Sequence, residues 1–343
     1  MSPTATALPS ASPDPLAPPL PRFAQIEPIG RCNLACRMCT VNERGDTVAE
    51  MSLAQFRALL DRMPGLEELH LQGLGEPMLH PQFFEMVELA ASRGIRVSAN
   101  TNATLVTPER ARRCAESGLA VLSVSLDGAS REVYEAVRRK ASFAKVLRNL
   151  DRIVAARDEA GSALELRAVM VLMRGNLDEL PALVRLLHEH RVPTLLVQRL
   201  SSDLAQPGLP SRYIPIRSYV ESAELGLAEL PRARVVFARA RELAASLGVT
   251  LHLPRLEPRA GGGGRCSWPS EQLYVTAAGE LLPCCMVATA DRASFGRVFE
   301  PGEDAPRLLE RWHGREAQLF RGALAAGEPP SVCRGCALYR GMF

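Results

Sequence analysis

The sequence lacks both a long apolar segment and a large excess of charge. No stretch of its 343 residues approaches the roughly 18 consecutive apolar residues that a membrane-spanning helix needs. The first positive charge is Arg22, so no basic region precedes an apolar one as in a secretory signal. The 41 Lys and Arg residues against 38 Asp and Glu leave a net charge of +3, too small to indicate a nucleic-acid partner. We therefore predict no membrane partner, no nucleic-acid partner and a cytoplasmic location.

Several common catalytic motifs are also missing. The sequence has no G-x-S-x-G, no P-loop and no G-x-G-x-x-G after its first apolar segment, which excludes the usual hydrolase, nucleotidase and dinucleotide-binding sites. Its six histidines show no i, i+4 pairing of a helical metal site. What stands out is nine cysteines. In a reducing compartment, cysteines bind metal or do chemistry more often than they form disulfides.

The order of apolar and helical patterns predicts the fold. Six short apolar segments lie between residues 23 and 200, and a helical pattern separates each from the next. Such alternation is typical of a parallel sheet with right-handed crossovers. We predict an α/β fold with a partial (β/α)6 barrel, an open doubly wound sheet being the alternative. The predicted parts are a disordered Pro-rich arm at 1–22, the barrel at 23–200, a connector with one helix at 201–260, and a small C-terminal domain at 261–343 that begins with a flexible Gly261–Gly264 joint.

The first cysteine group directly follows the first predicted strand. Cys32, Cys36 and Cys39 have the spacing C-x3-C-x2-C, which suits a compact loop around one face of a cluster. A [4Fe–4S] cluster takes four protein ligands when fully ligated, so three leave one iron open for reactivity. The alternative is a zinc site or three buried thiols. Zinc needs a fourth ligand, and no Cys or His follows Cys39 before His70.

These residues resemble the radical S-adenosylmethionine (radical SAM) superfamily, whose signature is C-x3-C-x-Φ-C with an apolar Φ. Met38 occupies the Φ position. The resemblance extends over residues 23–200 and implies that Cys32, Cys36 and Cys39 bind a [4Fe–4S] cluster. It implies further that the open iron chelates SAM, that one electron cleaves the sulfonium, and that the resulting 5′-deoxyadenosyl radical abstracts a hydrogen atom from the substrate.

The resemblance also implies which residues hold SAM. QGLGEP at 72–77 is similar to the GGE element that binds the SAM amino group, with Leu74 in place of its first glycine. NTN at 100–102 and SVSLDG at 123–128 end the third and fourth predicted strands, where their Asn and Ser suit either cofactor contacts or helix caps. The predicted SAM-binding residues are Met38, Gly75, Glu76, Pro77, Asn100, Ser125 and Arg138. For Arg138, a solvated surface position is an equal alternative.

The second cysteine group lies in the C-terminal region. Cys266 and Cys284 have the pattern C-x12-G-x4-C, and Cys333 and Cys336 form a C-x2-C pair. Four thiolates close either a cubane site or a structural zinc site. The arrangement resembles the SPASM and twitch domains of radical SAM enzymes, which implies one auxiliary [4Fe–4S] cluster on these four cysteines. Two cysteines remain: we interpret Cys114 as a core residue, and Cys285 as an inert neighbour rather than an alternative ligand or a hydrogen donor.

Together these patterns predict a radical SAM enzyme, an oxidoreductase or epimerase acting on a small biosynthetic intermediate of the sugar or aminocyclitol type. An external one-electron donor, a flavodoxin or ferredoxin, is expected as partner. The first alternative is a maturase of a ribosomally made peptide or protein. We disfavour it because the segment before the barrel is short and too polar to fold as a leader-binding module. A second alternative is a non-enzymatic redox-sensing or nucleic-acid-binding module that uses Fe–S or zinc knuckles.

Metal analysis distinguishes the cluster and zinc interpretations. The anaerobically reconstituted chain should contain about eight irons, because each cubane holds about four. One zinc and about four irons per chain would instead make the C-terminal site structural.

Overall fold

The computed structural model describes residues 16–43, 49–201, 204–258, 266–300 and 305–342. Within these ranges one ten-stranded sheet has the order β10-β9-β8-β1-β2-β3-β4-β5-β6-β7. The strands are β1 (Phe23–Ile26), β2 (Glu68–Leu71), β3 (Arg96–Thr101), β4 (Leu119–Ser125), β5 (Glu165–Leu172), β6 (Thr194–Arg199), β7 (Thr250–His252), β8 (Gln272–Val275), β9 (Glu280–Leu282) and β10 (Gly296–Arg297). The helices are α1 (Leu53–Asp61), α2 (Phe83–Ala91), α3 (Pro108–Glu116), α4 (Arg131–Val137), α5 (Phe143–Glu159), α6 (Leu180–Glu189), α7 (Ile214–Ala223), α8 (Leu230–Leu247), α9 (Trp268–Glu271), α10 (Leu308–Trp312) and α11 (Arg315–Ala325).

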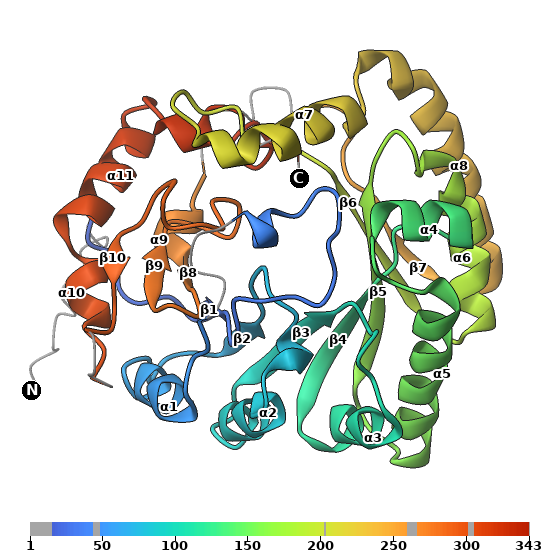
Figure 1. Ribbon diagram of the computed structural model, residues 1–343, viewed down its shortest axis with the longest axis horizontal. Helices are drawn as coiled ribbons and strands as arrows, with labels where there is room; N and C mark the ends of the chain where they lie inside the picture. The colour runs from blue at the N-terminus through green and yellow to red at the C-terminus, as the bar shows by residue number, and fades with distance from the viewer. Residues whose placement is uncertain (1–15, 44–48, 202–203, 259–265, 301–304, 343) are drawn as a thin grey trace, which may run out of the picture.

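Strands β1 to β7 pair in parallel with their neighbours, as the alternating pattern predicts. The sheet curves into a partial barrel, and the crossover helices α1, α2, α3, α5 and α6 lie along its outer side (Figure 1). Local signals begin these helices. The Ser52 side chain forms a capping box with Gln55, and Thr107 caps α3 ahead of Pro108. The predicted partial α/β barrel is confirmed.

The connector contributes more structure than the sequence pattern predicts. The expected helix is α8, but α7 precedes it, and the three-residue strand β7 follows it and pairs with β6. A three-residue strand is too short to produce a detectable alternation. Along the upper side of Figure 1, α7 lies between the β6 side of the barrel and the C-terminal helices.

The C-terminal region shares its sheet and core with the barrel. Strand β8 pairs in parallel with β1, Phe23 lying opposite Gln272, and β9 and β10 continue the sheet in antiparallel pairing. Leu273 and Trp312 belong to the same buried apolar cluster as Ala24 at the start of the barrel. The C-terminal strands are therefore held by sheet hydrogen bonds and by the main core. The predicted Gly261–Gly264 joint lies outside the described residues.

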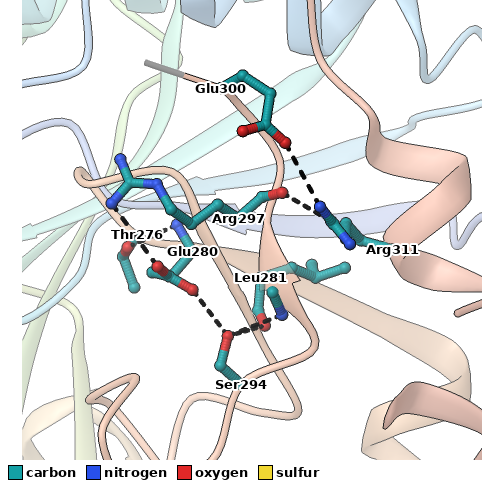
Figure 2. Close-up of polar contacts among 8 residues, drawn as sticks. Thr276, Glu280, Leu281, Ser294, Arg297, Glu300 and Arg311 are labelled. Atoms are coloured by element: carbon teal, nitrogen blue, oxygen red, sulfur yellow. Dashed lines mark hydrogen bonds and ion pairs between the residues drawn. The ribbon is translucent and has the colours of Figure 1, made fainter. Parts of the chain in front are cut away.

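Polar contacts fix the edge of this sheet (Figure 2). Glu280 on β9 accepts a hydrogen bond from Ser294 Oγ at 2.8 Å and forms an ion pair with Arg297 at 3.8 Å. Arg311 Nε donates to the carbonyl of Arg297 at 2.9 Å, and its guanidinium pairs with Glu300 at 3.5 Å. These contacts tie α10 to the two-residue strand β10, which has few backbone hydrogen bonds of its own.

Part of the Pro-rich arm is ordered, which corrects the expectation of disorder over residues 1–22. Trp312 Nε1 donates to the carbonyl of Pro18 at 2.8 Å, and Arg321 Nη1 donates to the carbonyl of Leu16 at 3.1 Å. The arm is too polar to fold alone, but the C-terminal helices supply buried donors for its carbonyls. Residues 1–15 lie outside the described residues.

The helices within the described ranges include no candidate for a membrane-spanning segment, because none combines the required length with sufficient apolar character.

Replacing Arg321 tests this anchoring. Arg321 is 3% exposed, and it also donates to the carbonyls of Pro269 at 2.9 Å and Trp312 at 2.7 Å. Arg321→Met leaves these buried carbonyls without a donor, and we expect the free energy of unfolding to fall by about 3 kcal/mol. Urea denaturation of the full chain measures it. The matched control is Arg315→Met at the exposed start of α11, expected within about 0.5 kcal/mol of wild type. Equal stability of the two variants would contradict the anchoring.

Candidate functional site

A cavity of about 240 Å³ lies at the carboxyl ends of the parallel strands. Parallel strands bring the loops that follow them to one edge of the sheet, so segments far apart in sequence meet there. Nine predicted residues line the cavity: Cys32, Cys36, Met38, Cys39, Gly75, Glu76, Asn100, Ser125 and Arg138. Pro77 is the exception, since it is buried at the first position of the short 3-10 helix Pro77–Leu79 beside the cavity.

The first cysteine loop is held against the end of α4. The Ala35 amide donates to the carbonyl of Arg139 at 3.2 Å, and the Arg37 amide donates to that of Val137 at 3.1 Å. The predicted Φ residue, Met38, packs against the small apolar cluster that includes residues of α7. The loop is thus fixed between the barrel and the connector, and its cysteines face the cavity.

Hydrogen-bond donors surround the sulfur atoms of this loop. The Leu34 amide donates to Cys32 Sγ at 3.4 Å and Asn102 Nδ2 donates to the same sulfur at 3.8 Å. Arg138 Nη1 lies 3.9 Å from Cys36 Sγ. Donors aimed at sulfur stabilise the negative charge of thiolates bound to iron. In the described part of the chain, no three Cys, His, Asp or Glu side chains form a ligand set for a single metal ion. The evidence that this loop can hold an iron–sulfur cluster is therefore the set of hydrogen-bond donors around its sulfur atoms.

Burial controls the ionisation of the three thiols. It raises the pKa of Cys32 to about 11 and that of Cys39 to about 12. Burial also raises the pKa of Cys36, against the opposing effect of the Arg138 charge. A buried thiol without a metal keeps its proton, and iron ligation displaces it. Ligation and the donors on sulfur therefore compensate for the burial of these groups.

Glu76 is a buried carboxylate on the cavity wall. Its Oε1 accepts hydrogen bonds from Thr101 Oγ1 at 2.7 Å and from the Met78 amide at 3.2 Å, and its Oε2 accepts one from the Asn102 amide at 2.8 Å. Burial raises its pKa, and these donors act against that rise. A carboxylate offers about four acceptor positions, so Oε2 retains capacity for one more donor. A bound ammonium would fill that position and favour the ionised form.

Arg138 is buried in an ion pair, which excludes the solvated surface position. Its Nε lies 2.7 Å from Oδ2 of Asp127, whose Oδ1 accepts from the Val171 amide at 2.7 Å. Burial alone would lower the pKa of Arg138, but Asp127 and Cys36 raise it, and the net shift is upward. The guanidinium therefore stays charged beside the cysteine loop, and it lines the cavity.

The C-terminal cysteines also approach one another. Cys284 and Cys333 belong to one buried cluster, and burial raises the pKa of Cys333 to about 12 and that of Cys284 well above its usual value. The pKa of Cys333 also rises through the charges of Cys336 and Cys266. The charges of Cys333 and Cys336 likewise act on Cys284, so the predicted ligands influence one another although, among the described residues, no three of them form a ligand set for one metal ion. Cys285 is half-buried next to Cys284, close enough to raise the pKa of that thiol.

The sequence patterns missed several residues around the cavity. Val169 and Val171 on β5 and Gln198 on β6 form the wall across the barrel from β1. Asp127 lies within the SVSLDG segment, but no local sequence pattern predicts that it pairs with Arg138. Glu27 follows β1 and contacts the QGLGEP loop. Glu27 could have been noticed as a carboxylate directly after a buried strand. The alternation of side chains along a strand could have identified the β5 and β6 residues that face the cavity.

Two family profiles match the chain. The profile of the radical SAM superfamily matches residues 26–187, and that of the SPASM iron–sulfur cluster-binding domain matches residues 266–337. Among curated proteins, the mycofactocin maturase MftC of Mycobacterium ulcerans is 36% identical over 126 residues, which cover 36% of this chain and 34% of MftC. The match thus spans about a third of that relative's length.

Solved structures share the fold at low sequence identity. Streptococcus suis SuiB bound to S-adenosylmethionine superimposes with a TM-score of 0.67 at 15% identity, over 94% of this chain and 72% of SuiB. SuiB is also known bound to the precursor peptide SuiA. BtrN in complex with AdoMet and 2-DOIA superimposes with a TM-score of 0.50 at 15% identity, over 95% of this chain and 98% of BtrN. At such identities these likenesses establish the fold.

The close packing of the cavity wall predicts the effect of one methyl group. A Cβ on Gly75 would lie 2.0 Å from the carbonyl oxygen of Ile29 and 2.8 Å from that of Arg31, both just before the first cysteine. Gly75→Ala should therefore shift the backbone and lower the free energy of unfolding by about 2 kcal/mol. Gly65→Ala is the control, because a Cβ there has no neighbour within 4 Å. Urea denaturation compares them, and an unaffected Gly75→Ala chain would contradict the packing described.

Proposed function

This chain belongs to the radical SAM superfamily and is an enzyme with a C-terminal SPASM domain, and from that premise we propose that it modifies a ribosomally made peptide or protein. The enzymatic part of this proposal rests on one observation. A single cavity at the strand ends is lined by the cysteine loop, Glu76 and Arg138. When bound there, the cluster and SAM supply one-electron cleavage of the sulfonium and a carbon radical that abstracts hydrogen.

The chain's own residues divide the work of holding SAM in this proposal. Cys32, Cys36 and Cys39 ligate three irons. Glu76 accepts a hydrogen bond from the SAM ammonium at its remaining acceptor position, and Arg138 attracts the carboxylate with the guanidinium edge that Asp127 leaves exposed to the cavity.

The other lining residues complete the cavity. Asn100 and Ser125, at the ends of β3 and β4, suit polar contacts to the ribose and carboxylate, and Met38 supports the cysteine loop from the side of α7. Val169, Val171 and Gln198 leave a mostly apolar wall on the far side for the substrate. An apolar wall helps to exclude water from the cavity around the substrate.

Sequence similarity supports the choice of a peptide substrate. MftC, at 36% identity over 126 residues, is named a maturase, and SuiB shares the fold and binds a precursor peptide. These comparisons favour a ribosomally made peptide or protein as the substrate over a small molecule of the sugar or aminocyclitol type.

A small biosynthetic intermediate is the second candidate substrate. BtrN, whose complex contains 2-DOIA, matches this chain over 98% of its own length. The match extends over 95% of this chain, which supports keeping a small molecule as a candidate substrate. The lower TM-score of 0.50 against 0.67 ranks this candidate second.

The proposal includes two further components. One auxiliary [4Fe–4S] cluster is ligated by Cys266, Cys284, Cys333 and Cys336, with Cys285 as an inert neighbour. A flavodoxin- or ferredoxin-type protein delivers electrons to the first cluster. The exposed Arg37, between two of the cluster ligands, supports such an approach, because a basic side chain there attracts an acidic electron carrier.

Deuterium transfer tests the substrate class. The reconstituted enzyme is incubated anaerobically with SAM and dithionite, and with synthetic peptides encoded by short genes next to its own, prepared with deuterium at non-exchangeable carbons. The proposal predicts that one such peptide accelerates 5′-deoxyadenosine formation at least about tenfold and transfers one deuterium to it, observed by mass spectrometry.

A parallel reaction with 2-DOIA provides the comparison. Acceleration by 2-DOIA and by none of the peptides would overturn the peptide proposal in favour of the small-molecule candidate.

Two cysteine variants test the role of the first cysteine group. Cys36→Ala should abolish 5′-deoxyadenosine formation. Cys114→Ala is the matched control and should retain it, because the buried Cys114 on α3 lies outside the cavity.

A further inference from the structure

Glu27 is a fully buried carboxylate that contacts two distant segments of the chain. Its Oε1 accepts hydrogen bonds from the amides of Leu74 at 2.8 Å and Gly75 at 3.2 Å, in the loop that contains Glu76. Its Oε2 accepts one from the amide of Ala277 at 3.1 Å. Ala277 lies in the turn between β8 and β9, inside the SPASM-matched region. One side chain therefore joins the cavity loop to the C-terminal domain.

The surrounding backbone is shaped around this carboxylate. A Cβ on Gly73 would lie 2.3 Å from both Cγ and Oε1 of Glu27, so a glycine is needed where the loop crosses the side chain. The amide of Glu27 donates to the carbonyl of Val275 at 2.9 Å, which continues the β1–β8 pairing up to the turn. Both segments thus meet Glu27 at close range.

The contacts depend on one another for a physical reason. A buried carboxylate has lost its hydration, so it needs donors, and charge-assisted hydrogen bonds from amides are among the strongest. Removing the Ala277 donor leaves Oε2 with one hydrogen bond fewer, and we expect the carboxylate then to shift toward the amides of Leu74 and Gly75. Any such shift moves Glu76, the next residue along the loop.

We propose that Glu27 is a positioning residue that couples the C-terminal hairpin turn to the SAM-binding loop. It acts through the amides of Leu74 and Gly75 on Glu76, so that docking of the auxiliary-cluster domain sets the affinity of the barrel for SAM. This inference rests on the proposed role of Glu76 in holding the SAM ammonium. It gives the hairpin a function in the first site in addition to carrying cluster ligands.

Ala277→Pro tests the coupling from the C-terminal side. The Gly279 amide donates to the carbonyl of Thr276 at 2.8 Å, which makes Ala277 the second residue of a tight turn. Proline is favoured at that position, so the substitution suits the turn while it deletes the donated hydrogen. Ala277→Gly is the matched control, because it changes the side chain at the same position and keeps the amide N–H.

Two measurements on the reconstituted full chain read the result without any substrate. Equilibrium binding of SAM should weaken about tenfold in Ala277→Pro and at least as much in Glu27→Gln, whose amide accepts through one oxygen instead of two. Hydrogen exchange of a peptide covering residues 72–79 should accelerate in both variants. Ala277→Gly should match wild type in both measurements.

The outcomes separate this inference from the proposed function. SAM affinity within about twofold of wild type and unchanged exchange at 72–79 in Ala277→Pro would overturn the coupling, and the same result in Glu27→Gln would do so even if Ala277→Pro failed to fold. Unchanged SAM binding in Glu76→Gln would instead refute the role of Glu76, while the exchange data would still decide whether Glu27 links the two segments. The substrate class affects neither measurement.

Discussion

Strand β1 pairs in parallel with β2 on one side and with β8 on the other, and this pairing positions both cysteine regions and the cavity. It makes one sheet out of a barrel and a C-terminal region that lie some 250 residues apart in sequence. It also places the first cysteine loop, which follows β1, between the Glu76 loop after β2 and the hairpin after β8. The two groups of cysteines therefore lie in segments attached to one continuous sheet and one apolar core.

The cavity beside that pairing concentrates buried polar groups that would be unstable alone. Glu76 accepts hydrogen bonds from Thr101, Met78 and Asn102. Arg138 forms an ion pair with Asp127. The cysteine sulfurs receive donors from backbone and side chains, although burial keeps the metal-free thiols protonated. Each group retains part of its capacity toward the cavity, which suits a ligand that carries an ammonium, a carboxylate and bonds to iron together. The preorganisation of these groups is what the fold contributes to the chemistry.

Local sequence pattern was enough to predict much of the fold and of the site. Alternating periodicity located the barrel strands, and because parallel strands end at one edge, it predicted that the cysteine loop, Glu76, Asn100 and Ser125 lie together. It could not find Glu27, whose partners lie 47 to 250 residues away. It also could not predict that part of the arm contacts the C-terminal helices. The composition of a segment indicates only whether that segment can fold by itself, whereas the donor on Trp312 lies 294 residues from Pro18.

Electron paramagnetic resonance of the dithionite-reduced, reconstituted chain, with and without SAM, distinguishes the two proposed clusters: one with an open iron in the barrel and one closed cluster in the C-terminal domain. We expect two cubane signals, of which addition of SAM changes one, and that signal is lost in Cys36→Ala while the other persists. A single signal, or two that both ignore SAM, would contradict the division into an open and a closed site.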